Sequence, residues 1–93
     1  MRLFAFTDTH GDKKIILSLI KKIRDSNPDI IICAGDLTNF GKNLKKLILI
    51  FKKTNLPFVI IPGNHETNSQ LTNACKKAFF AVNIHKRIYH VNN

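Results

Sequence analysis

Three short apolar runs divide the chain, and each of them ends in a polar loop that contains a glycine. The runs cover residues 1–7, 29–34 and 58–61. Residues 29–34 are largely apolar without alternation, which is typical of a strand covered on both faces in a parallel sheet. The three runs are therefore predicted to be parallel strands of one sheet.

The segments between these runs carry apolar residues at the spacing of amphipathic helices. The first predicted helix spans residues 12–27 with Asp12 as its N-cap, the second follows Gly41, and the third spans residues 69–80. A proline follows each of the first two helices and ends it. The residues predicted to face inward are Ile16, Leu19, Ile20, Ile23, Leu44, Leu47, Ile48, Phe51, Leu71, Ala74, Cys75, Ala78 and Phe79.

Residues 81–91 are predicted to form one or two short strands around Lys86. The order of elements is βαβαβ, so the fold class is α/β with a mainly parallel sheet and flanking helices. The 93 residues suffice for one modest core. Residues 1–93 are interpreted as one domain or part of one, and the end at Asn93, where a hairpin would return, favours a truncated domain.

The composition restricts the class of protein. Hydrophobic residues make up 44% of the chain, as in globular proteins. The sequence has no apolar run near the roughly 18 residues that cross a bilayer, and no secretory leader pattern. Cys33 and Cys75 fall in apolar or helical patterns, which favours reduced core residues over a disulfide. These features predict a soluble chain in the cytoplasm, with no membrane partner.

The formal net charge of +9 favours polyanionic partners such as nucleic acid, nucleotides or phosphorylated surfaces. Most lysines occur in pairs at helical positions, where they would equally serve as the solvated faces of amphipathic helices. Both interpretations stay open. The acidic residues are more informative, because Asp8, Asp36 and Glu66 are half of the six in the chain and each follows a predicted strand.

Ligand-type side chains follow all three predicted strands. Right-handed crossovers bring the carboxyl ends of parallel strands to one edge of the sheet, which is the usual ligand site of open α/β folds. The three loops carry Asp8-x-His10, Gly35-Asp36 and Gly63-Asn64-His65-Glu66. Each motif alone is weak, but three in register at successive strand ends predict a metal site.

The donor atoms of these motifs are mixed in type. Asp8 and Asp36 offer carboxylate oxygens, Asn64 a neutral oxygen and His10 an imidazole nitrogen, a set that suits Mn, Fe, Co, Ni or Zn. Asp36, on the central strand, could bridge two ions. His65 could supply a proton or stabilise developing charge without binding metal.

These motifs resemble those of the calcineurin-like metallophosphoesterases, which run D-x-H, G-D and G-N-H-E or G-N-H-D, followed by a lone His and a final G-H-x-H. The resemblance spans nearly the whole chain, and it implies the N-terminal half of a metallophosphoesterase sandwich. It also implies a two-metal site, with manganese favoured, that hydrolyses a phosphoester. Asp8 and His10 would hold the first ion, Asp36 would bridge, Asn64 would hold the second, and His65 would be the catalytic histidine.

Two departures from subgroups of this family point to a phosphodiesterase or nuclease. Phe40 stands where the protein phosphatases of the family have the arginine of G-D-x-x-D-R-G. Asn39 stands where purple acid phosphatases have a metal-bound tyrosine three residues after the bridging aspartate. The expected substrate is therefore a phosphodiester, with nucleotides and nucleic acid as candidates.

The lone His and G-H-x-H motifs are absent from the sequence. His85 and His90 lie in a strand-like segment and are predicted not to replace them. A further C-terminal segment or a partner chain is therefore expected to complete the second metal position. The alternative is a non-catalytic remnant that binds divalent metal or polyanions.

Overall fold

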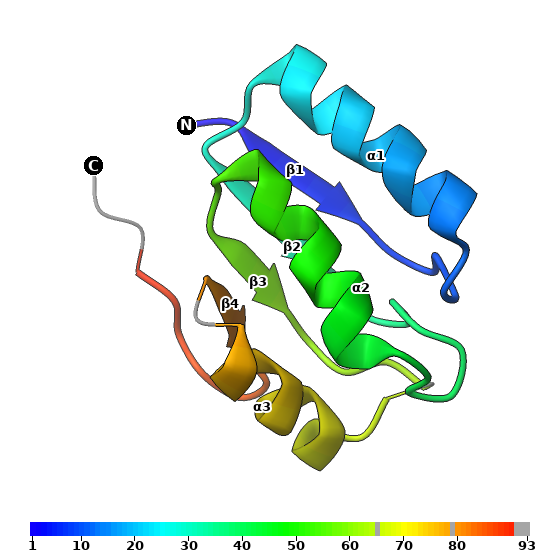
Figure 1. Ribbon diagram of the computed structural model, residues 1–93. Helices are drawn as coiled ribbons and strands as arrows, with labels where there is room; N and C mark the ends of the chain where they lie inside the picture. The colour runs from blue at the N-terminus through cyan, green and yellow to red at the C-terminus, as the bar shows by residue number, and fades with distance from the viewer. Residues whose placement is uncertain (65, 79, 91–93) are drawn as a thin grey trace.

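A computed structural model describes residues 1–64, 66–78 and 80–90 of the chain. Its centre is a sheet of four parallel strands in the order β1-β2-β3-β4 (Figure 1). The strands are β1 (Leu3–Phe6), β2 (Ile30–Cys33), β3 (Phe58–Ile60) and β4 (Ala81–Asn83). The predicted α/β class and the parallel direction of the first three strands are confirmed.

The helices alternate with the strands along the chain. They are α1 (Lys13–Ser26), α2 (Leu44–Ile50), the 3₁₀ helix η1 (Phe51–Thr54) and α3 (Asn68–Lys77). The predicted second helix is divided between α2 and η1, and its end lies before Asn55, which has a φ of 57°. The predicted third helix also ends early, at Lys77, and the predicted inward position of Phe79 lies outside the described residues.

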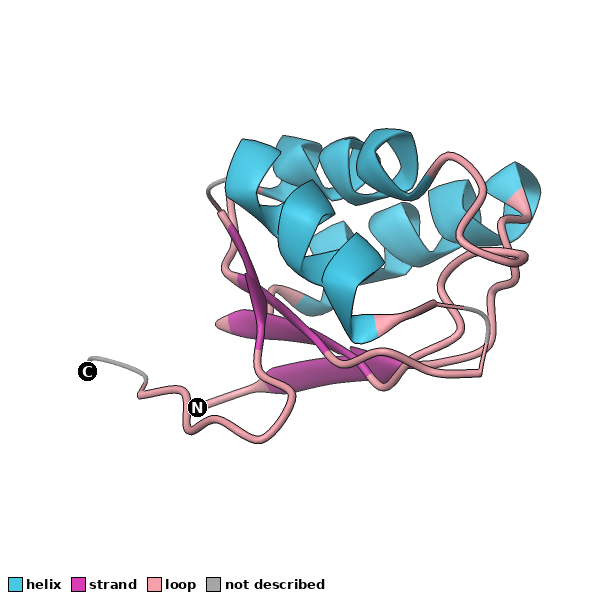
Figure 2. Ribbon diagram, turned by 90° about the horizontal axis from the view of Figure 1, so that it is seen from below, coloured by secondary structure: helices cyan, strands magenta, loops and turns pink. Residues whose placement is uncertain are grey.

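All of the helices lie on one face of the sheet (Figure 2). Because each strand pairs with the next one in sequence and the crossovers share one hand, successive helices must fall on the same side. Phe6, Phe51 and Phe58 meet there, with ring centroids 5.3 Å apart for Phe6 and Phe51 and 4.7 Å apart for Phe51 and Phe58. Aliphatic residues of the three α-helices complete the core.

The opposite face of the sheet is less covered. Leu3 is 59% exposed and Ile61 is 36% exposed, and Ala5 is exposed as well. The central strand β2 still has three buried residues, although Ile32 is only half-buried. Residues 29–34 were expected to be buried on both faces of the sheet. Those of β2 are fully buried on the face that packs against the helices and only partly buried on the other face.

Residues 81–91 were predicted to hold one or two strands. Within the described residues they hold one, β4, which pairs in parallel with β3. Residues 84–90 form no strand, and Val91 lies outside the described residues. No helix in the described ranges is long and apolar enough to span a membrane.

Both cysteines are free and buried, as the sequence predicts. Burial raises the pKa of the Cys33 thiol to about 12 and also raises the pKa of Cys75. At neutral pH both side chains are therefore protonated thiols, which are poor metal ligands and poor nucleophiles. This agrees with a metal site built from oxygen and nitrogen donors.

Candidate metal centre

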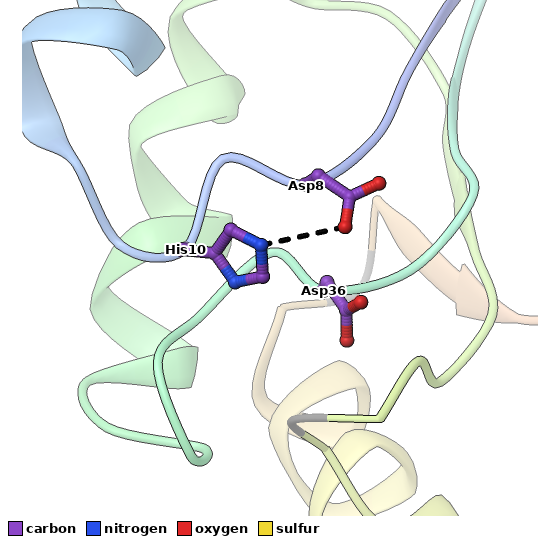
Figure 3. Close-up of side chains that lie close together, drawn as sticks. All are labelled: Asp8, His10 and Asp36. Atoms are coloured by element: carbon purple, nitrogen blue, oxygen red, sulfur yellow. Dashed lines mark ion pairs between the residues drawn. The ribbon is translucent and has the colours of Figure 1, made fainter.

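Three predicted ligands meet beyond the carboxyl ends of β1 and β2. Asp8 and His10 come from the loop after β1, and Asp36 comes from the loop after β2 (Figure 3). One ligand atom from each side chain lies within 4.8 Å of the other two. Among the His, Cys, Asp and Glu residues that the structure describes, these three form the group whose side chains lie close enough together to hold a metal ion.

Backbone hydrogen bonds hold the two loops in register. The parallel pairing of β1 with β2 continues past the strands, because amides of the first loop donate to carbonyl oxygens of the second. The donor-to-acceptor distances are 3.2 Å from Asp8 N to Gly35 O, 3.1 Å from His10 N to Asp36 O and 2.8 Å from Gly11 N to Leu37 O. The buried Thr9 hydroxyl also donates to Leu37 O, at 2.8 Å. The ligands therefore stand on a fixed backbone.

The three ligand residues share an unusual backbone conformation. Their φ angles are 61° for Asp8, 47° for His10 and 51° for Asp36, all in the left-handed region. Non-glycine residues rarely adopt this region, although Asp and His do so more often than most, and five other described non-glycine residues share it.

The side chains of Asp8 and His10 already interact. His10 Nε2 lies 3.4 Å from Asp8 Oδ1, while the Thr7 hydroxyl donates to Asp8 Oδ2 at 2.8 Å. Thr7 thereby fixes the rotation of the carboxylate. The side chains of His10 and Asp8 are 42% and 54% exposed, so an ion in solution can reach them.

The donor set fits a borderline divalent ion. Carboxylate oxygens and an imidazole nitrogen bind such ions at about 2.1 Å, so two ligand atoms on one ion lie at most about 4.2 Å apart. The widest separation allowed in the group is 4.8 Å, which small side-chain rotations can close. Asp8, His10 and Asp36 can therefore hold one ion together.

The third loop packs directly against the second. A Cβ atom added at Gly63 would overlap the Asp36 carboxylate and the Asp36 backbone nitrogen. On the other side, a Cβ at Gly35 would lie 3.0 Å from Gly63 Cα. Only glycine at position 63 leaves room for Asp36 in its present place. The third motif therefore has a glycine here because the backbone at position 63 lies so close to Asp36.

The remaining predicted site residues belong to this third loop. Asn64 is exposed and lies in the turn that directly follows Gly63. His65, predicted to be catalytic, lies outside the described residues. His85 and His90 are exposed and are not members of the ligand group.

Glu66 connects the third loop to the second instead of joining the ligands. Its side chain is buried, and Oε2 accepts hydrogen bonds from the Thr38 amide at 3.0 Å and the Thr38 hydroxyl at 2.7 Å. The other oxygen, Oε1, accepts from the Gly63 amide at 3.4 Å. The Thr38 hydroxyl in turn accepts from Gly41 N at 2.8 Å. The sequence placed Glu66 in a site motif, but Thr38 carried no signal that it would be the partner.

The order of the motifs, the parallel sheet and the ligand group agree with one family. The sequence pattern of the calcineurin-like phosphoesterases matches residues 1–93. The chain belongs to this family. The resemblance inferred from the three motifs is thereby confirmed.

Two individual proteins are similar to this member of the calcineurin-like phosphoesterases. A probable cyclic nucleotide phosphodiesterase of Vesicomyosocius okutanii subsp. Calyptogena okutanii (strain HA) is 33% identical over 76 residues, which are 80% of this chain and 31% of that protein. The crystal structure of TT1561 of Thermus thermophilus superposes with a TM-score of 0.79 at 18% identity. The superposition covers 92% of this chain and 42% of the Thermus chain. At this identity, the likeness shows a shared fold and nothing more. The chain thus spans less than half of either relative.

Proposed function

We propose that this chain provides the first half of the catalytic centre of a metal-dependent phosphodiesterase. The observation that carries the proposal is the meeting of Asp8, His10 and Asp36 at the carboxyl edge of the sheet, with ligand atoms within 4.8 Å. The family match and the phosphodiesterase name of the Vesicomyosocius relative support the reaction class. Manganese is the favoured ion, and a nucleotide is the favoured kind of substrate.

Each residue has a separate role in this proposal. Asp8 and His10 would hold the first ion, Asp36 would be shared by both ions, and Asn64 would contribute a neutral oxygen to the second. When bound, the two ions supply Lewis acidity to the phosphoryl group and lower the pKa of the attacking water. His65, next to Asn64 in the chain, would supply a proton or stabilise developing charge without binding a metal ion.

The surrounding residues hold these groups in place. Thr7 fixes the Asp8 carboxylate, and the pairing of the two loops fixes the positions of Asp8 and His10 relative to Asp36. Glu66, bonded to Thr38 and the Gly63 amide, joins the loop that carries Asn64 and His65 to the loop that carries Asp36. Such preorganisation matters because a displacement of about 1 Å can reduce a rate by 10²-fold.

In this arrangement, the chain would supply three ligands to the first ion and two to the second. We therefore propose that residues 1–93 are the N-terminal part of one metallophosphoesterase domain, and that a further segment or a partner chain supplies the missing histidines. The second candidate is a non-catalytic chain that binds metal or polyanions. Hydrolysis of bis-p-nitrophenyl phosphate with Mn²⁺, by a form that carries a histidine-bearing C-terminal segment, separates the two. Absence of turnover in that form favours the second candidate.

Asp36→Asn is expected to reduce metal loading more than Asn64→Ala does. The first substitution removes a negative charge shared by both ions, whereas the second removes one neutral donor from the weaker position. After loading with Mn²⁺ and dialysis, the Asp36→Asn variant should retain less than about a tenth of the wild-type metal, since even the loss of a group that hydrogen-bonds to a ligand lowers affinity by about 10- to 100-fold. Equal retention in the two variants, measured by elemental analysis, would contradict the bridging role of Asp36.

A further inference from the structure

Charge is distributed unevenly between the two parts of this chain. Residues 1–36 contain six basic and five acidic residues, whereas residues 37–93 contain nine basic residues and one acidic residue. That one acid, Glu66, is buried and accepts hydrogen bonds from Thr38 and Gly63, so it does not neutralise the surface lysines. The part of the chain that contains α2, η1 and α3 therefore presents an almost purely positive surface.

A groove of about 480 Å³ lies on this positive surface, between α2 and α3. Lys45 and Lys46 line it from α2, and Lys77 lines it from α3. The exposed residues Asn43, Gln70 and Asn73 also line it, together with the buried Leu44 and Ala74. The residues that line the groove include no acid. It offers cationic and amide donors together, the combination that binds phosphate oxygens.

One end of the groove continues into the loop that carries Asp36. Gly41 lines the groove, and its neighbour Phe40 is 78% exposed at a φ of 55°. The same loop lies beside the first ligand loop, since a Cβ at Gly11 would be 3.6 Å from Asn39 N. The exposed Phe40 therefore neighbours a residue that lines the groove, in the loop that leads from Asp36 to α2.

We propose that the groove between α2 and α3 binds the phosphate backbone of single-stranded nucleic acid and that a base stacks on Phe40. Proteins that bind single strands combine a basic groove with exposed aromatic side chains. The proposal goes beyond the phosphodiesterase function, since binding in the groove requires neither the metal ions nor His65.

The test measures binding without catalysis. Fluorescence anisotropy of labelled dT12 in EDTA, at 50 to 200 mM NaCl, gives the affinity and its dependence on salt. Replacing Lys45, Lys46 and Lys77 with Gln should weaken binding at least 10-fold and reduce the salt slope by about 2, because each lost phosphate contact in a single strand removes about 0.7. Circular dichroism checks that the variant is folded.

A matched control removes three charges elsewhere. Lys21, Lys22 and Arg24 are exposed on α1, away from the groove, and their replacement with Gln lowers the net charge equally. This control should weaken dT12 binding less than 3-fold. If both triple variants lose affinity equally, binding follows net charge alone and the groove is not a site.

Phe40→Ala distinguishes nucleic acid from other polyanions. Stacking of a base on an aromatic ring contributes about 5- to 160-fold in affinity, so Phe40→Ala should weaken dT12 binding by an amount in that range. Binding of inorganic polyphosphate, which has no bases, should be unchanged. An equal effect on both ligands, or tighter wild-type binding to anionic phosphatidylserine vesicles than to dT12, would overturn the proposal.

Discussion

The isolated 93-residue chain is expected to hydrolyse bis-p-nitrophenyl phosphate with Mn²⁺ at least about 100- to 1,000-fold more slowly than a form extended by a histidine-bearing segment. The reason is the number of ligands. In two-metal hydrolysis the ions lie about 3.5–4 Å apart and together stabilise the attacking and leaving oxygens. Loss of one preorganised stabilising group typically costs about 10²- to 10³-fold in rate, and Asp36 and Asn64 alone would hold the second ion weakly.

The extended form also provides the controls for this prediction. Asp36→Asn or His65→Ala should return its rate to that of the isolated chain, whereas Lys22→Gln on α1 should leave the rate unchanged. Steady-state release of p-nitrophenol measures all of these proteins. If the isolated chain is as active as the extended form, then His85, His90 or a second copy of the chain must complete the second metal position.

Gly63→Ala is expected to reduce Mn²⁺ affinity at least about 10-fold, although position 63 provides no ligand. The added methyl group overlaps the Asp36 carboxylate and its backbone nitrogen, so either Asp36 or the third loop must move. Displacement of backbone is harder than rotation of a side chain, and overpacking of this kind costs about 1–3 kcal/mol in the free energy of unfolding. A moved Asp36 would no longer share an ion with Asp8 and His10.

Gly11→Ala is the matched control for this substitution. Gly11 has a φ of 77°, so alanine there costs about 1–2 kcal/mol of backbone strain, but its Cβ would meet no atom closer than 3.6 Å. Urea unfolding in EDTA measures both stability changes, and Mn²⁺ electron paramagnetic resonance measures the affinities. Wild-type affinity in the Gly63→Ala variant would show that the close packing of Gly63 does not position Asp36.

The sequence predicted the strands and the ligand loops well because local signals determine them. The apolar runs ended at polar residues, and Asp12 was correctly predicted as the cap of α1, where its carboxylate accepts from Lys14 N at 2.9 Å and Ile15 N at 3.3 Å. The topology of parallel strands then carried Asp8, His10 and Asp36 to one edge of the sheet without any tertiary information.

Features that depend on contacts between loops were not predicted. The pairing of Glu66 with Thr38 joins residues 28 positions apart, and neither periodicity nor composition indicates it. The change from α2 to η1 at Phe51 and the end of η1 before Asn55 were not predicted either, because the apolar pattern alone would continue one helix. The left-handed φ angles of the three predicted ligand residues were not predicted either.

Calorimetric titration of the chain with Mn²⁺ tests the proposed metal centre most directly. In the proposed centre, Asp8, His10 and Asp36 would provide three ligands to one ion, and Asp36 and Asn64 would provide two to the other. The titration should therefore show one site that binds at least about 10-fold more tightly than a second, and Asp36→Asn should abolish the tight phase. Two equally tight sites, or a tight phase that persists in Asp36→Asn, would contradict a centre built on these three residues.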